Sequence, residues 1–236
     1  MPEDEKITIV GFPSTGLVGA FAVSYIVKSL KMKRIGELEA FEISPSVRIQ
    51  NGNVYGPFQI YNKDNIYVIL SNIPLFSESA FIFVKSVIEY CKKINVDKII
   101  IPRGMIVMGP EENPPASFGL TVNEISKKML QEYNLSVITD ASIVGADAGV
   151  ISALKKSDIP NLILYTICNM KFPDSNAIVK AIETLAKIIN VKIDTLKFEE
   201  NLEQISKDNE RLIEQTKKSL EKPNEASPSM PSPGIG

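Results

Sequence analysis

The chain has 236 residues, of which 44% are hydrophobic and 23% charged, and its formal net charge is -2. This composition is typical of a globular protein that buries a full core without disulfides, and the near-neutral charge does not favour a nucleic-acid partner. The sequence contains no histidine, which excludes zinc sites and Ser-His or Cys-His nucleophile pairs in their usual forms.

Three features indicate the cellular compartment. No apolar run reaches the roughly 18 residues that a membrane-spanning helix needs. Residues 1–6 are polar and acidic, unlike a secretory signal. Cys91 and Cys168 lie in apolar, periodic segments, so we expect both to be reduced and buried. The expectation is a cytoplasmic protein with no membrane partner.

The first half of the chain predicts alternating strands and helices. A buried strand at 6–10 is followed by a helix with an apolar face, and extended segments follow at 36–43, 47–50, 58–61 and 66–70. Asn51-Gly52 indicates a hairpin turn, because both residues accept positive φ, so 36–70 resembles a meander. Ser77 is the predicted N-cap of the next helix.

The second half continues the alternation. It predicts strands at 97–102, 136–139 and 162–167, a loop at 104–115, and helices at 121–133, from 149 to about 156, and from 174 to 189. Strands without polar residues are typical of a parallel sheet covered on both faces. We therefore predict an α/β fold, a three-layer α/β/α sandwich, with residues 1–195 as the core domain.

Beyond the core, residues 196–222 are charge-dense and predict an amphipathic helix. Its seam has 3-4-3-4 spacing and consists of Leu202, Ile205, Asn209, Leu212 and Thr216. The helix either packs on its own domain or forms a short coiled coil. Residues 223–236 are rich in Pro and Ser and predict a disordered tail.

The glycines of residues 11–19 follow the first strand, where glycine-rich loops bind phosphates at a helix N-terminus. The spacing of Gly11, Gly16 and Gly19 matches neither the dinucleotide fingerprint nor the P-loop, and Leu17 stands where the P-loop has lysine. The alternative is structural: Gly16 and Gly19 permit close helix–sheet packing, and Gly11 and Pro13 belong to a turn. We favour the structural interpretation.

The remaining candidate positions also have structural explanations. Gly145 and Gly149 enclose Asp147, a predicted N-cap that would repel a phosphate. Pro173-Asp174 fits a turn and helix start. Arg103 ends an apolar strand, where α/β sheets place ligands, and with Glu111 and Glu112 it either joins a site or forms a surface salt bridge. The sequence thus predicts no catalytic residue, no cofactor and no metal.

In order and spacing, these motifs resemble the proteasome assembly chaperone family. Residues 11–20 (GFPSTGLVGA) are similar to its opening motif, 145–149 (GADAG) to its later glycine motif, and 172–177 (FPDSNA) to its proline-aspartate motif. The resemblance covers about residues 7–205.

The resemblance implies a nucleoside-phosphorylase-like fold without that active site, homo-oligomers as in archaeal members, and binding to proteasome α-subunits. It also implies a tail that docks between α-subunits through a hydrophobic residue, a Tyr and a final residue. Pro233, Gly234, Ile235 and Gly236 stand there, with Ile235 in place of the Tyr.

Three functions remain open on the sequence alone. The first is a non-enzymatic chaperone or adaptor for the proteasome. The second is an enzyme on the same fold, of nucleoside phosphorylase or nucleotide-binding type, against which the missing histidine and phosphate loop weigh. The third is a structural oligomer with another partner.

Overall fold

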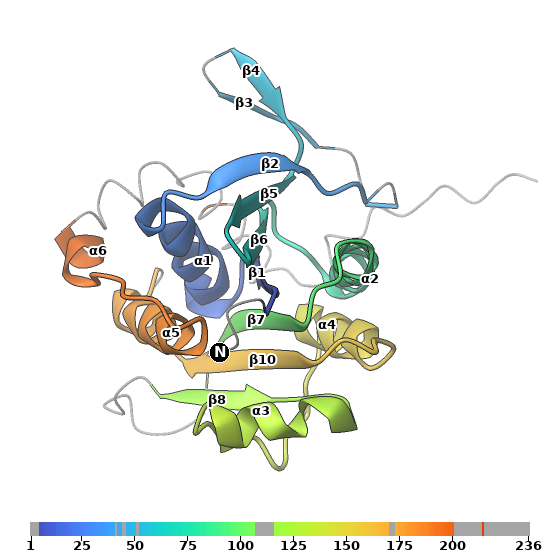
Figure 1. Cartoon of the computed structure of the whole chain (residues 1–236), viewed down its shortest axis with the longest axis vertical. Helices are drawn as coiled ribbons and strands as arrows, with labels where there is room; N and C mark the ends of the chain where they lie inside the picture. Colours follow the sequence, from blue (N-terminus) through green and yellow to red (C-terminus); the bar gives the residue numbers. More distant parts are fainter. Residues whose placement is uncertain are drawn as a thin grey trace, which may run out of the picture.

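An eight-stranded mixed sheet lies between two layers of helices (Figure 1). The computed structural model describes residues 5–40, 42–43, 46–50, 52–106, 116–169, 173–200 and 214. In spatial order the strands are β2 (Lys33–Glu37), β5 (Phe58–Lys63), β6 (Ile66–Ser71), β1 (Ile7–Gly11), β7 (Lys98–Met105), β10 (Asn161–Ile167), β8 (Ser117–Leu120) and β9 (Ser136–Val137). This arrangement confirms the predicted α/β/α architecture.

The four central strands β6, β1, β7 and β10 are parallel. On either side of them, β5 pairs antiparallel with β6, and β8 pairs antiparallel with β10. The central strands are apolar at nearly every position because each face is covered by helices. Successive residues therefore enter different cores: Ile9 and Ile100 face one helix layer, while Val10 and Ile101 face the other.

The helices divide between the two faces of the sheet (Figure 1). One face carries α1 (Val18–Ser29), α5 (Ser175–Ile188) and α6 (Leu196–Glu200), and the other carries α2 (Ser77–Lys93) and α4 (Ala146–Leu154). The short helix α3 (Lys127–Glu132) lies beside β8. Two single turns of 3-10 helix, η1 (Thr15–Leu17) and η2 (Glu124–Ser126), precede α1 and α3.

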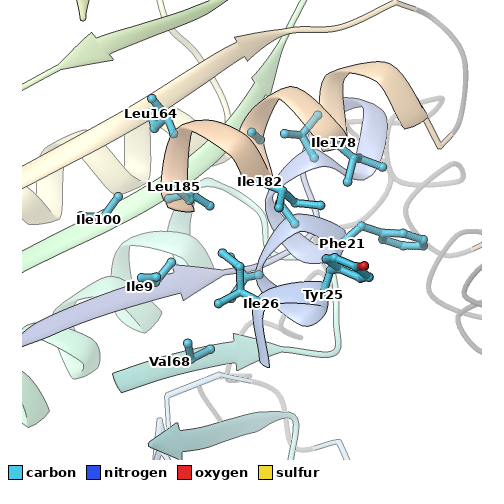
Figure 2. Close-up of a cluster of buried hydrophobic side chains, with 14 of the residues drawn as sticks. Ile9, Phe21, Tyr25, Ile26, Val68, Ile100, Leu164, Ile178, Ile182 and Leu185 are labelled. Carbon is cyan, nitrogen blue, oxygen red and sulfur yellow. The ribbon is translucent and has the colours of Figure 1, made fainter. Parts of the chain in front are cut away.

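Apolar stripes at helical spacing bind α1 and α5 to the sheet. Figure 2 shows Ile26 of α1 and Leu185 of α5 directed toward Ile9 and Ile100 of the central strands. Full burial of each such side chain contributes about 1.5–3 kcal/mol to folding. The periodicity of the sequence thus translates directly into the contact between the helices and the sheet.

The helix α6 forms the first turn of the predicted 196–222 helix, and it packs on the domain. Phe198 is fully buried, and its ring lies edge-on to Tyr25 of α1, with centroids 5.1 Å apart. The Tyr25 hydroxyl donates to the carbonyl of Asp194 at 2.7 Å. The five seam residues, from Leu202 to Thr216, and the tail 223–236 lie outside the described residues, so the predictions for them stay predictions.

A two-stranded hairpin, β3 (Arg48–Gln50) and β4 (Asn53–Tyr55), projects beyond β2 at one end of the sheet (Figure 1). Gly52 has φ +76, as the predicted turn requires. Among the described strands, β3 and β4 pair with each other and with no other strand, and they interrupt the meander formed by β2, β5 and β6.

The structure corrects the sequence prediction in four respects. The strand β8 was not predicted, and the helix expected over 121–133 is reduced to η2 and α3. The Ser77 N-cap is wrong: Phe76 precedes the helix, and its N–H donates to the Ser79 hydroxyl at 2.8 Å. The loop expected from 104 begins later, because β7 continues through Met105, and 107–115 lie outside the described residues.

Replacing Gly149 with Ala should destabilise the fold. A Cβ at Gly149 of α4 would lie 2.1 Å from the Ser77 carbonyl oxygen of α2, so the two helices would have to separate. We expect Gly149→Ala to lower the free energy of unfolding by about 1–3 kcal/mol, measured by chemical denaturation. The matched control is Gly36→Ala on β2, where a Cβ meets no atom of the described residues within 4 Å. Equal stability of the two variants would contradict the close approach.

Candidate functional site

The glycine-rich segment 11–19 crosses the carboxyl ends of the central strands, where open α/β sheets usually bind ligands. It leaves β1 and forms η1 before α1 begins. Gly16 and Leu17 both have left-handed backbones, with φ of 63 and 58, and Leu17 is fully buried. A left-handed leucine is uncommon, so the surrounding contacts must hold this turn in place.

Those contacts come from the end of β7. Successive backbone N–H groups of a strand point to opposite sides. In β7 the N–H of Ile99 points toward β10 and donates to the Pro160 carbonyl, so the N–H groups of even-numbered residues point toward β1. The pairing of β7 with β1 ends at Ile100. Beyond that point Pro102 has no N–H to satisfy, and the N–H of Gly104 donates to the Ser14 hydroxyl at 3.2 Å. Pro102 therefore stands in a central strand without leaving an unpaired backbone donor on the side that faces β1.

The Ser14 hydroxyl links β7 to the start of α1. It also accepts the N–H of Gly19 at 3.0 Å, and it is buried. One of the backbone donors that a phosphate would use at this helix N-terminus, the N–H of Gly19, is thus already occupied by the protein.

Two glycines allow the segment to lie against β7. A Cβ at Gly19 would be 2.5 Å from the Pro102 carbonyl oxygen, and a Cβ at Gly104 would be 2.0 Å from that of Thr15. At Gly11, a Cβ would be 2.6 Å from the Cβ of Val23 in α1. The geometry gives these glycines a role in close packing, which supports the structural interpretation over a phosphate cradle.

A buried ion pair closes the opposite side of the segment. Arg103 of β7 is only 3% exposed, and its Nε donates to Oδ1 of Asp147, in the first turn of α4, at 2.5 Å. Its Nη1 donates to the Pro13 carbonyl at 3.3 Å, and its guanidinium lies 4.1 Å from the centre of the Phe12 ring. The protein itself occupies each of these faces of the arginine.

This pair differs from the sequence predictions for both residues. Asp147 is not the N-cap of α4, since Gly145, with φ +70, occupies that position. The surface salt bridge for Arg103 is also wrong, because Arg103 is buried. The partners considered from the sequence, Glu111 and Glu112, lie outside the described residues.

Tyr165 of β10 lies beside the ion pair. It is 1% exposed, and its hydroxyl has no hydrogen-bond partner among the described residues. Burial raises its pKa, the Asp147 charge raises it further, and Arg103 opposes them. The phenol is therefore neutral at physiological pH.

Asp174 joins the glycine segment to α5. Its Oδ1 accepts the N–H of Ala177 at 3.1 Å as the N-cap, and its Oδ2 accepts the N–H of Asn169 at 2.7 Å. Its own N–H donates to the Gly16 carbonyl at 3.1 Å. The half-buried Pro173 leads into this cap.

The nucleophilic side chains here are not activated. Burial raises the pKa of the Cys168 thiol to about 12, and the Asp174 charge adds to the effect. Burial likewise raises the pKa of Cys91 to about 11. Both thiols are protonated at neutral pH and therefore weakly reactive. The described residues contain no cluster of three or more Cys, Asp or Glu side chains suited to a metal ion.

The structure brings together most of the positions that the sequence singled out. Gly11, Pro13, Gly16, Gly19 and Asp174 meet at the carboxyl ends of the central strands, whereas Gly145 and Gly149 lie on α4. The tail residues 233–236 lie outside the described residues. The ion pair and the buried Tyr165 were missed. The signal for them in the sequence was a charged residue, Arg103, directly after the apolar run 99–102.

Comparison with known proteins agrees with this architecture. Residues 8–213 match the model of the PAC2 family. Two uncharacterized proteins of Methanocaldococcus jannaschii are 26% and 24% identical, over 93% and 92% of this chain and 90% and 85% of their own lengths. No helix within the described part of the chain is both long and apolar enough to span a membrane.

Solved structures share the fold. PbaA of Pyrococcus furiosus, described as an archaeal homolog of proteasome-assembly chaperone, is 25% identical with a TM-score of 0.78, covering 93% of this chain and 97% of its own. PbaB of the same organism, described as an archaeal proteasome activator, is 18% identical with a TM-score of 0.67, covering 90% and 95%. The resemblance inferred from the motifs is confirmed.

Removing the Asp147 charge should destabilise the protein, because Arg103 would keep its charge in a buried site. We expect Asp147→Asn to lower the free energy of unfolding by about 2–3 kcal/mol. This loss is small for a broken buried ion pair because the Asp147 side chain is 22% exposed.

Two controls separate this effect from a general loss of charge. Asp158→Asn removes an exposed partner of Lys92 and should cost about 0.5 kcal/mol or less. The double variant Arg103→Met with Asp147→Leu should be more stable than Asp147→Asn. If Asp147→Asn unfolds at the same denaturant concentration as the unchanged protein, the ion pair does not hold the segment.

Proposed function

Since the chain belongs to the PAC2 family, we propose that it is a non-enzymatic chaperone or adaptor that binds proteasome α-subunits and assists assembly of the proteasome core particle. The observation that carries the proposal is the 25% identity to PbaA across 93% of the chain, together with the TM-score of 0.78. A role with the proteasome also favours the cytoplasm as its location.

The geometry at the carboxyl ends of the strands supports a binding role over the enzymatic alternative. The Gly19 N–H donates to Ser14, and Arg103 is engaged by Asp147, the Pro13 carbonyl and the Phe12 ring. A phosphorylase-like or nucleotide-binding site needs such donors to be available for the substrate. These groups instead hold the loop on the sheet, so partner binding would use the outer surface.

We further propose that residues 223–236 contribute to binding α-subunits through Pro233, Gly234, Ile235 and Gly236. The proposal rests on the family resemblance and on the apolar side chain of Ile235 in a segment rich in Pro and Ser. Such a proline-rich segment loses little conformational entropy when it binds a partner. The folded core and the tail would then engage the partner together.

Binding to isolated proteasome α-subunits of the same organism tests both parts of the proposal. We expect the full chain to bind them in surface plasmon resonance. We expect deletion of residues 223–236, and separately Ile235→Asp, to weaken binding with an unchanged unfolding midpoint. Failure of the full chain to bind would contradict the function. Unaltered affinity of both variants would contradict the role of the tail.

We propose in addition that the protein is a homo-oligomer. Two apolar stretches of the sequence, 72–76 and 101–108, are candidates for core or interface. The described residues of the second stretch are largely core, and Phe76 and Ile106 are partly exposed. The larger exposure lies on the β3–β4 hairpin, where Val47, Ile49 and Val54 are 68%, 71% and 64% exposed.

These hairpin side chains share one face. Ile49 lies directly opposite Val54 in the antiparallel register, and Val47 precedes Ile49 by two residues. An isolated two-stranded hairpin is only marginally stable in water. An apolar face on such a hairpin is therefore a reasonable contact surface for a second copy of the chain.

Light scattering tests the oligomer. We expect a mass at micromolar concentration that is a multiple of the 26.0 kDa chain, and we expect Ile49→Asp with Val54→Asp to lower that mass. Val144→Asp is the control, since Val144 is equally apolar and 83% exposed but lies outside the hairpin. A mass of 26.0 kDa for the unchanged chain would contradict the proposal.

A further inference from the structure

The outer surface of the α2/α4 layer contains an apolar groove. Gly149 brings α4 against the N-terminal turn of α2, and the helices run side by side from there. However, α2 has 17 residues and α4 has nine. At 1.5 Å per residue, α2 is longer by about 12 Å. Within the described part of the chain, its second half therefore extends past α4 with no helix beside it on that side.

The groove left beside α4 has a volume of about 360 Å³. Its lining consists of Phe81, Lys85, Ile88, Glu89, Lys92, Ala153 and Lys156. Ile88 and Ala153 are buried and form an apolar floor, while Phe81 is half-buried at one end. A cavity of this size and lining suits one or two large apolar side chains rather than a polar metabolite.

The rim of this groove is basic. Lys85, Lys92 and Lys156 are exposed, and Glu89 is the single acidic residue in the lining. The Lys156 Nζ lies 5.2 Å from the centre of the Phe81 ring. Lys92 also pairs with Asp158 at 3.3 Å, but both side chains are largely exposed, so the pair is weak.

A second groove on the other side of α2 has the opposite charge. It measures about 410 Å³ and lies between α2 and the segment after β2. Glu37, Glu39 and Glu42 line it with Glu89, against Lys85 and Lys93. Lys85 and Glu89 line both grooves, so the difference in charge comes from Lys92 and Lys156 in the groove beside α4 and from Glu37, Glu39 and Glu42 in the second groove. A partner can distinguish the two grooves by this difference.

We propose that the α2/α4 groove is a docking site for an acidic segment of a partner protein that carries an apolar anchor residue. The anchor would fill the space over Ile88 and Ala153, and flanking carboxylates would pair with Lys85, Lys92 and Lys156. This combination of a buried apolar anchor and a charged rim is the usual anatomy of a peptide site. The inference does not depend on the proteasome, because it rests on the groove alone.

Fluorescence polarisation with the full chain tests the proposal. The probe is a fluorescein-labelled peptide in which a central Leu-Phe pair is flanked on both sides by Asp and Glu. We expect saturable binding that weakens as salt is raised. A peptide with Ser in place of Leu-Phe, and one with Lys and Arg in place of the acids, should each bind at least about tenfold more weakly.

Charge variants locate the binding. Lys156→Glu should weaken binding of the acidic peptide by about fivefold. The matched charge reversal Lys192→Glu, at an exposed position on the side of the other helix layer, should leave the affinity within about twofold of that of the unchanged chain. Glu89→Lys should tighten binding by about threefold, an effect that misfolding cannot produce.

Three outcomes would overturn the proposal. One is equal binding of the acidic and basic peptides, and another is an equal response of Lys156→Glu and Lys192→Glu. The third is loss of peptide binding at high protein concentration, which would show that a second copy of the chain occupies the groove. No proteasome component is present, so failure here leaves the proposed function standing, and failure to bind α-subunits leaves the groove standing.

Discussion

The fold depends on how closely the backbone of residues 15–19 lies against the end of β7. The carbonyl oxygens of Thr15 and Pro102 occupy the space that side chains at Gly104 and Gly19 would need. Ser14 then joins the two segments by accepting an N–H from each. This contact fixes the start of α1, and α1 in turn positions the apolar stripe that packs with α5 and holds Phe198 of α6.

The same contact explains why polar groups are buried at a position where related folds bind ligands. With the glycine segment against β7, Arg103 can reach the Pro13 carbonyl, the Phe12 ring and Asp147 together. A buried arginine is costly unless its charge is matched, and here the protein matches it internally. The carboxyl ends of the strands thus serve to join both helix layers to the sheet.

Most of the architecture was predictable from the sequence because its physical signals are local. The apolar runs of β1, β7 and β10 and the helical spacing in α1 and α5 reflect burial, and Asn51-Gly52 marks a turn by its own backbone preference. The strand β8 escaped prediction because four residues give no periodicity, and its place depends on pairing with β10. The Arg103–Asp147 pair escaped for a similar reason, since 44 residues of chain separate the partners.

The placement of the β3–β4 hairpin has a consequence for how this protein can diversify. Its hydrogen-bonded register is independent of the main sheet, while β2 and β5 on either side of it pair directly with each other. Insertions, deletions or changes of sequence between Arg48 and Tyr55 therefore leave the ladder of the domain intact. Changes in the length or sequence of this projection can therefore accumulate without altering the core of the domain.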